Sequence, residues 1–267
     1  MVDPHVIRDA AERLLVAERT RTPMRQLSQQ YPQLTFDDAY AIQRAGVELR
    51  LAEGLTVKGR KIGLTSRAMQ QSVNITEPDY GVLYDDMFFA DGSTVPLDRF
   101  IAIRIEVELA FVLGRPLEGP NCTLFDVLNA TDYVTPAIEI LDSRIQMKDP
   151  VSGSARTIID TISDNAADAG IITGGRAVRP HDVDLRWVSA LLYQNGVIEE
   201  SGVAAAVLNH PANGVAWLAN KLALHGIGLE AGQVLLAGSF TRPVWVHAGD
   251  TFHIDYGPLG SIAFHCA

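Results

Sequence analysis

Two glutamates in the segment RIEVELAFVLG, residues 104–114, are the first side chains in this sequence that could do chemistry together. The segment alternates as a β-strand does: large apolar side chains fall on one face, and Glu106 and Glu108 fall together on the other. Residues at this spacing lie roughly 6.5–7 Å apart at Cα. Two ionised carboxylates there repel each other, and burying them unpaired would cost several kcal/mol each.

Three environments could offset this repulsion: bulk water, basic neighbours such as Arg104, or a divalent cation. A solvated face is the ordinary case for a half-buried antiparallel strand. The apolar face nevertheless indicates a central strand, and Ala110 and Val112 continue the acidic face without charge. A third acid, Glu139, lies in the extended segment TPAIEILDSR, and carboxylate oxygens suit Mg²⁺ or Mn²⁺. Acids are common, so spacing alone leaves all three environments open.

Two other residues have an ordinary structural interpretation from spacing alone. Lys61 stands in a basic run with Lys58 and Arg60, and exposed lysines are the norm. Asp79 follows Pro78, which is typical of a turn, so a turn and a chemical role both stay open.

The elements that must position these residues occur in blocks. Residues 5–20 and 35–54 have helical patterns, the second with Thr35 as N-cap and Gly54 at the C′ position. Residues 57–70 begin as a short strand and break into a Gly/Thr/Ser loop. From there to about residue 115 the pattern indicates strands and turns.

The second half continues in the same way. Residues 121–134 are predicted as a helix, and 134–144 as an extended segment. Residues 186–199 form a hairpin, since Asn195-Gly196 suits a type I′ turn. A helix is expected over 209–226, with strands from Gly232 onward.

This segregation of helices and strands predicts an α+β fold. We expect a small helical part over residues 1–56 joined to a sheet-rich catalytic domain over 57–267, built on a mixed or antiparallel sheet.

Composition excludes several classes of protein. The net charge of −10 argues against nucleic acid or an anionic membrane as a general partner. Two cysteines without a Cys/His cluster argue against a disulfide framework or a structural zinc site. The charged N-terminal segment is not a signal peptide, and no apolar run approaches the ~18 residues of a membrane span. We therefore expect a cytoplasmic protein that acts on a small molecule.

Longer segments resemble one family. They are similar to the hydratases of aromatic meta-cleavage pathways in the fumarylacetoacetate hydrolase superfamily, over essentially the whole chain. The segments that carry the resemblance are GRKIGLTSRAMQ (59–70), EPDYG (77–81), RIEVELAFVLG (104–114), NATDYVTPAIEILDSR (129–144), SDNAADAG (163–170) and LNHPANGVAWLANKLA (208–223).

The resemblance implies a role for particular residues. Glu106, Glu108 and Glu139 match the family's metal-binding glutamates, with Mg²⁺ the usual ion and Mn²⁺ an alternative. Lys61 and Asp79 match active-site residues; beside a cation and away from water, Lys61 would have a lowered pKa and could act as an acid or base. The loop beside the 2-oxo acid end of the substrate would be formed by Gly63, Leu64, Thr65 and Ser66.

The resemblance also implies a fold and a reaction. It implies a mixed sheet rolled into a partly open barrel, a homo-oligomer, and the addition of water to C4 of a 2-oxo-enoate in homoprotocatechuate catabolism. A five-carbon monoacid substrate and a decarboxylation stay open as alternatives. Hydrolysis is less favoured, because the sequence has no histidine between Lys61 and Glu106.

Two loops and four arginines stay without a settled role. The loops at 163–166 and 238–241 are expected to face the pocket. A seven-carbon diacid would need a site for its distal carboxylate. Its candidates are Arg67, Arg144, Arg156 and Arg242.

Overall fold

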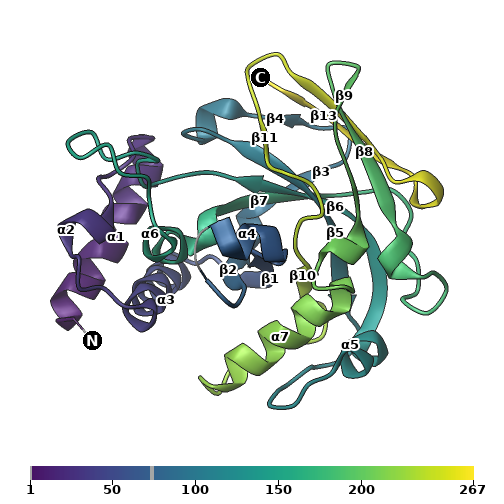
Figure 1. Ribbon diagram of the computed structural model, residues 1–267, viewed down its shortest axis with the longest axis horizontal. Helices are drawn as coiled ribbons and strands as arrows, with labels where there is room; N and C mark the ends of the chain where they lie inside the picture. Colours follow the sequence, from purple (N-terminus) through teal and green to yellow (C-terminus); the bar gives the residue numbers. More distant parts are fainter. Residues whose placement is uncertain (1, 73–74) are drawn as a thin grey trace.

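The computed structural model describes residues 2–72 and 75–267 (Figure 1). The helices in these ranges are α1 (Pro4–Thr20), α2 (Leu27–Gln30), α3 (Phe36–Ala52), α4 (Arg67–Ser72), α5 (Leu124–Ala130), α6 (Ile158–Ser163) and α7 (Pro211–Ala223). The strands are β1 (Val57–Gly63), β2 (Asp79–Tyr84), β3 (Phe88–Ala90), β4 (Thr94–Val95), β5 (Arg104–Leu113), β6 (Thr131–Leu141), β7 (Asp168–Thr173), β8 (Ser189–Gln194), β9 (Val197–Val203), β10 (Val234–Leu236), β11 (Val244–Trp245), β12 (Thr251–Asp255) and β13 (Ser261–Cys266).

The strands form two sheets. The larger has the order β2-β1-β10-β5-β6-β7-β3, with β11 also paired to β5, and the smaller has the order β4-β13-β12-β8-β9. Pairing is mixed, because β1 runs parallel to β10 and β3 parallel to β7, whereas β5 and β6 are antiparallel. The sheets curve around one hydrophobic core that contains buried residues of both (Figure 1). The predicted α+β class, with a mixed sheet in a partly open barrel, is confirmed.

Local signals placed several elements correctly. Thr35 caps α3 in a capping box with Asp38, and Gly54 adopts φ +98° just after the helix. Asn195 and Gly196 have φ of 53° and 83° between β8 and β9, as a type I′ hairpin requires. The apolar face of β5 is buried, and β5 is a central strand.

The helix predicted over 121–134 is too long. It begins after Thr123, which forms a capping box with Asp126, but it ends at Ala130. Residues from Thr131 onward belong to β6 and pair with β5. β-branched and aromatic residues follow Ala130, and their pairing with a buried central strand outweighs the helical pattern.

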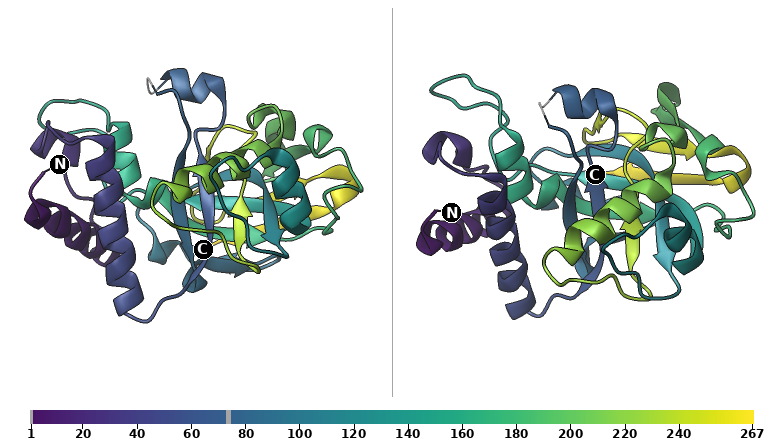
Figure 2. Two further views of the ribbon diagram at one scale, coloured as in Figure 1. Left: turned by 90° about the horizontal axis from the view of Figure 1, so that it is seen from below. Right: turned by 60° about the horizontal axis from the view of Figure 1, so that its bottom comes forward.

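The N-terminal helices form a layer beside the sheets (Figure 2). Helix α3 packs on α1 and on α6, and the N-terminal helices share a separate apolar cluster that includes Leu14, Leu27 and Ile42. This layer also holds the segment after β6. Gln26 Nε2 donates to the carbonyls of Gln146 (3.2 Å) and Ser154 (3.0 Å), and Arg25 pairs with Asp149 at 2.6 Å.

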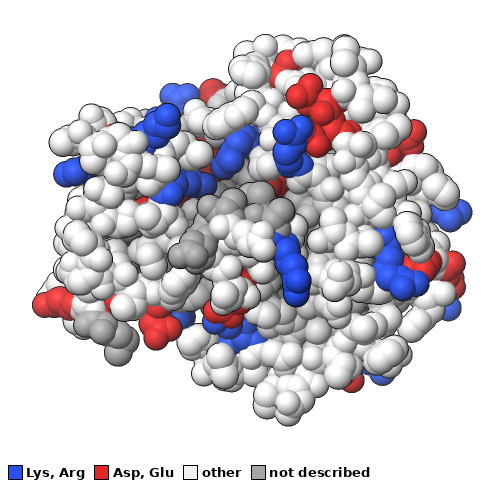
Figure 3. Space-filling view, in the orientation of Figure 1, with Lys and Arg blue, Asp and Glu red and all other residues white. Residues whose placement is uncertain are grey.

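Charged side chains on the surface are dispersed. On the face shown in Figure 3, Lys and Arg are scattered among Asp and Glu and do not merge into one basic field. Within the described ranges, every helix is too short or too polar to traverse a lipid bilayer.

Strand β1 depends on a glycine. A Cβ at Gly59 would lie 1.9 Å from the carbonyl oxygen of Val234, its partner on the parallel strand β10. We expect Gly59→Ala to lower the free energy of unfolding by more than about 2 kcal/mol, because backbone must shift to admit the methyl group. Denaturant unfolding followed by circular dichroism measures this.

The matched control is Gly46→Ala in the interior of α3, where no atom lies within 4 Å of the added Cβ. It should be neutral or stabilise by about 0.5–1 kcal/mol. Equal effects of the two substitutions would contradict the steric argument.

Candidate active site

Three carboxylates from two neighbouring strands converge in the larger sheet. The antiparallel register of β5 and β6 places Glu106 directly opposite Glu139, and Glu108 follows on the same face of β5. One oxygen from each of the three lies within 4.8 Å of the others. Glu108 and Glu139 are fully buried and Glu106 is partly buried, so the solvated face left open from the sequence is wrong.

The cluster has too little positive charge around it. Oε2 of Glu108 accepts the Gly238 N–H at 2.8 Å, but Oε1 of Glu108 and both oxygens of Glu139 have no hydrogen-bond partner of ordinary geometry among the described residues. Burial and then repulsion by Glu139 raise the pKa of Glu106 to about 8 and that of Glu108 well above its usual range. Buried, unpartnered carboxylate oxygens are the donor set of a Mg²⁺ or Mn²⁺ site, so the residues fit such an ion.

Lys61 is the nearest cation to this cluster. Its side chain is buried, and Nζ lies 3.0 Å from Oε1 of Glu139, so the interpretation as a surface lysine is wrong. The lowered pKa expected for Lys61 beside a cation stays a prediction, because it depends on a bound metal ion. Burial lowers the pKa of Lys61, but the charges of Glu139, Asp79 and other acids outweigh burial and raise it. Lys61 is therefore a cation.

Asp79 lies beside Lys61 because a glycine makes room for it. Asp79 begins β2 and is paired with Gly63 at the end of β1. A Cβ on Gly63 would lie 2.2 Å from Oδ1 of Asp79 and 3.1 Å from Nζ of Lys61. Asp79 is buried in a strand, so it is no turn residue, and burial raises its pKa.

The loop after β1 is fixed from two sides. Leu64 has a positive φ of 57°, and its carbonyl accepts a hydrogen bond from Gln70 Nε2 at 2.9 Å. Thr65 is buried, and its carbonyl accepts the Leu208 N–H at 3.2 Å. Its side chain packs closely on Gly238, since a Cβ added there would lie 2.3 Å from Oγ1 of Thr65. Leu64, Thr65 and Ser66 all face a cavity.

Two adjoining cavities give access to the cluster, and they share Leu64, Glu106 and Pro243 in their walls. One has a volume of about 400 Å³ and is lined by Ser239, Phe240 and Thr241 of the predicted 238–241 loop. The other, of about 280 Å³, is lined by Lys61 and Asp79, and by Ala166 of the 163–166 loop. Both loops therefore face the pocket as expected, and Glu106 is reached from both sides.

Sequence reasoning missed Asp168. It begins β7, it is fully buried, and its charge acts on Lys61. Its carboxylate oxygens lack a hydrogen bond of ordinary geometry within the described ranges, although the Gly170 N–H lies near enough to oppose the rise in pKa that burial causes. The segment SDNAADAG was conspicuous in the sequence, but its spacing did not distinguish Asp168 from the other acids in it.

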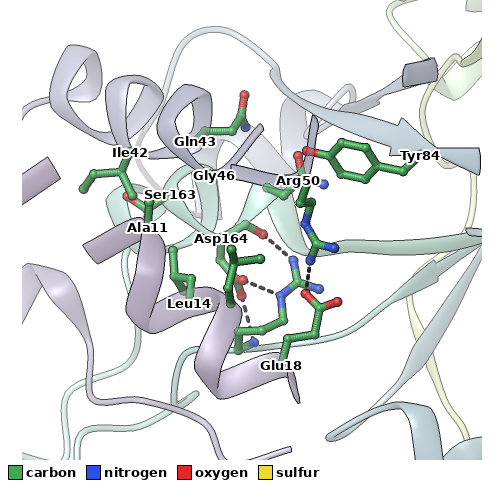
Figure 4. Close-up of a pocket in the computed structure, with 13 residues that line it drawn as sticks. Ala11, Leu14, Glu18, Ile42, Gln43, Gly46, Arg50, Tyr84, Ser163 and Asp164 are labelled. Atoms are coloured by element: carbon green, nitrogen blue, oxygen red, sulfur yellow. Dashed lines mark hydrogen bonds and ion pairs between the residues drawn. The ribbon is translucent and has the colours of Figure 1, made fainter. Parts of the chain in front are cut away.

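A third cavity has a structural role. It has a volume of only about 40 Å³ and lies between α1, α3 and the sheet (Figure 4). Glu18 pairs with Arg50 there, and Asp164 accepts hydrogen bonds from the Arg144 side chain and backbone. Its charges are paired, and it is too small for a substrate. It joins the N-terminal helices to the sheet.

Comparisons with known proteins agree with this geometry. Residues 55–266 match the family model "Fumarylacetoacetate (FAA) hydrolase C-terminal". The chain is 64% identical to the 2-oxo-hept-4-ene-1,7-dioate hydratase of Escherichia coli over 98% of both chains. It is 38% identical to a 2-keto-4-pentenoate hydratase of Paraburkholderia xenovorans, over 97% of this chain and 94% of the relative.

A solved structure matches the whole fold. The 4-oxalocrotonate decarboxylase from Pseudomonas putida G7, complexed with magnesium and adipate, superposes with a TM-score of 0.94 at 35% identity. The match covers 100% of this chain and 99% of the other.

Removing one carboxylate should separate stability from metal binding. We expect metal-free Glu108→Gln to be at least as stable as the wild type at pH 8, with a gain of up to about 1 kcal/mol, because a buried carboxyl group whose ionisation the fold opposes is removed. Mg²⁺ affinity should fall at least about 100-fold, because a ligand is lost. Thermal unfolding with and without Mg²⁺ and calorimetric titration measure the two effects.

The control is Glu199→Gln at an exposed position on β9, which makes the same charge change away from the cluster. It should alter neither the stability of the metal-free protein nor the Mg²⁺ affinity. Unchanged Mg²⁺ affinity in Glu108→Gln would exclude the cluster as the ion's site.

Mg²⁺ binding should release protons near neutral pH. Below about pH 8, Glu106 in the metal-free chain holds a proton that the ion must displace, and the raised pKa of Glu108 acts in the same direction. Affinity is therefore greatest above about pH 8 and is lost as pH falls. Calorimetry in two buffers of different ionisation enthalpy, from about pH 6 to 9, counts the released protons. Affinity independent of pH would contradict the raised pKa values.

Proposed function

The chain belongs to the fumarylacetoacetate hydrolase family, and from that premise we propose that it is a metal-dependent hydratase, a hydro-lyase. Its substrate is 2-oxo-hept-4-ene-1,7-dioate or the 2-hydroxydienoate tautomer, and water adds at C4 to give 4-hydroxy-2-oxoheptanedioate. One observation carries the proposal. A buried cluster of three glutamates, with too little positive charge around it, opens on a cleft that also contains Lys61 and Asp79. The identity to the Escherichia coli hydratase supports it.

Glu106, Glu108 and Glu139 hold the metal ion in this proposal, Mg²⁺ or alternatively Mn²⁺. Bound there, the ion supplies a Lewis acid for the negative charge that develops on the C2 oxygen of a 2-oxo acid. The protein's part is to keep three carboxylates together on two rigid strands, so that no reorganisation is needed when the ion binds.

Lys61 and Asp79 move the protons. When the 2-hydroxydienoate ketonises, its C2 hydroxyl proton is lost and C5 gains a proton, which leaves a C3=C4 bond conjugated with the C2 carbonyl. Asp79 then takes a proton from water as the water oxygen attacks C4, because burial raises its pKa and its Oδ1 is buried without a hydrogen-bond partner of ordinary geometry among the described residues. Lys61, kept protonated by Glu139 and Asp79, donates a proton to the substrate carbon skeleton. One proton is taken and one is given, so the sum is the addition of one water molecule.

The loop after β1 positions the 2-oxo acid end. Thr65 is fixed by its contacts with Gly238 and Leu208, and Ser66 faces the same cavity. Hydroxyl and backbone donors of Gly63–Ser66 at this place suit a carboxylate.

The pathway and the assembly are part of the same proposal. The reaction belongs in the meta-cleavage degradation of homoprotocatechuate, and the chain forms a homo-oligomer. Light scattering coupled to size exclusion would measure the number of subunits.

Product analysis tests the reaction. With Mg²⁺ and a freshly generated seven-carbon dienol, we expect 4-hydroxy-2-oxoheptanedioate and no carbon dioxide. Carbon dioxide without a hydroxylated product would instead make the chain a 2-oxo-3-hexenedioate decarboxylase. A strong preference for the five-carbon monoacid would make it a 2-hydroxypenta-2,4-dienoate hydratase.

The proton-transfer roles predict losses in kcat. Lys61→Met and Asp79→Asn should each lower kcat by about 10²–10⁴-fold, as expected when a general acid or base is removed. The control is Lys58→Met, which removes the same charge from an exposed position on the same strand and should keep wild-type kcat. Steady-state kinetics on each purified variant decides. Wild-type kcat in Lys61→Met would remove Lys61 from the mechanism.

A further inference from the structure

We propose that Arg156, assisted by Arg104, forms a carboxylate subsite that binds the distal end of a dicarboxylic substrate and so selects a diacid over a monoacid. The inference rests on the proposed function, since it concerns which 2-oxo acid the same site accepts. It comes from the cavity of about 280 Å³ that both arginines line together with Lys61 and Asp79.

Arg156 is oriented without being neutralised. Its Nη1 donates to Oγ of Ser143 at 2.6 Å, and that hydroxyl donates to the carbonyl of Ile145 at 2.6 Å. Ser143 is buried and uncharged, so it fixes the guanidinium and leaves its charge in place. Among the described residues, no carboxylate lies within the 4.0 Å of an ion pair with Arg156. A half-buried guanidinium of this kind needs an anion from elsewhere.

Arg104 adds a second cation to the same wall. Its guanidinium stacks over the Trp245 ring at 5.2 Å, and its Nε is buried without a hydrogen-bond partner in the described part of the chain. Burial lowers the pKa of Arg156, and the charge of Arg104 acts in the same direction against the opposing charge of Asp164. Two cations that repel each other beside one cavity are stabilised by an anion bound in it.

The cavity also has apolar side chains that suit a hydrocarbon chain. Besides its charged residues and Thr157 and Thr161, its lining includes Leu141, Met147, Ala155, Ile158, Ala166 and Ala167. A 2-oxo diacid combines the same properties, with a polar group at each end and methylene groups between them.

The other arginines considered from the sequence do not fit. Arg144 is fully engaged, since Nε and Nη2 donate to Asp164 and Nη1 donates to the Asp168 carbonyl, and it lines neither cavity of the cleft. Arg242 lines the larger cavity, but it pairs with Glu200 and its side chain is 81% exposed. Arg67 is exposed and lines neither cavity.

The segment that carries Arg156 is held by the N-terminal helices. The bonds from Arg25 to Asp149 and from Gln26 to Gln146 and Ser154 fix residues 146–154, immediately before Arg156. The subsite is therefore formed before a ligand arrives, which limits the ordering cost of binding.

Two saturated analogues of equal length test the subsite. Calorimetric titration of the Mg²⁺-loaded protein with 2-oxoheptanedioate and 2-oxoheptanoate compares ligands that differ only in the distal carboxylate. We expect the wild type to bind the diacid about 10- to 100-fold more tightly, as one charge-assisted hydrogen-bonded pair provides. In Arg156→Gln this preference should disappear, and the affinity for the monoacid should stay within about 3-fold.

Arg186→Gln is the control. It removes the same charge from a surface ion pair with Asp184 that lines neither cavity, and it should keep the wild-type preference. If Arg156→Gln does not fold, Arg156→Lys decides, because it keeps the charge and loses only the forked geometry. A loss confined to the diacid supports the subsite, and an equal loss for both analogues, or no loss, overturns it.

The readout is binding without turnover, so it is independent of the hydratase assay. Equal affinity of the wild type for the two analogues would overturn the subsite even if hydration is observed. A clear preference for the diacid would leave the subsite standing even if the proposed reaction fails.

Discussion

The repulsion among buried carboxylates is the constraint on which the rest of this structure depends. Glu106, Glu108 and Glu139 lie on two paired central strands, where burial and the charge of Glu139 disfavour ionisation of Glu106 and Glu108. Central strands cannot separate to relieve this, because the opposite face of β5 belongs to the hydrophobic core. The fold therefore holds the acids together at a cost in stability, as functional sites often do.

The charges around this cluster are of two kinds. Behind the cleft, Arg144 and Asp164 satisfy each other almost completely, and this pair contributes to the junction of helices and sheet (Figure 4). Facing the cleft, Lys61 has more acidic neighbours than it can neutralise, whereas Arg104 and Arg156 have no ion-pair partner in the described ranges. Paired charges maintain the architecture, and unpaired charges face the space that a ligand would fill.

Much of the local structure could be predicted from the sequence because its causes are local. The alternation in β5, the capping box at Thr35 and the Asn195-Gly196 turn depend on a few consecutive residues. The end of α5 was missed because it depends on pairing between β5 and β6. The acids that raise the pKa of Lys61 in the metal-free chain could not be identified from the sequence, because they come from four separate strands. The roles of Lys61 and Asp79 came from family resemblance, since spacing alone favoured a surface position for Lys61 and left Asp79 open between a turn and a chemical role. The division of the chain at residue 57 stays a prediction.

The attachment of the segment before Arg156 to the N-terminal helices has a consequence for how such an enzyme can diversify. The glutamates and Arg104 lie on the innermost strands, while the segment before Arg156 is held by a peripheral layer through Arg25 and Gln26. Substitutions in that outer layer can change which substrates are accepted and leave the metal-binding residues unchanged. A family with this arrangement can widen its range of substrates through changes at its periphery.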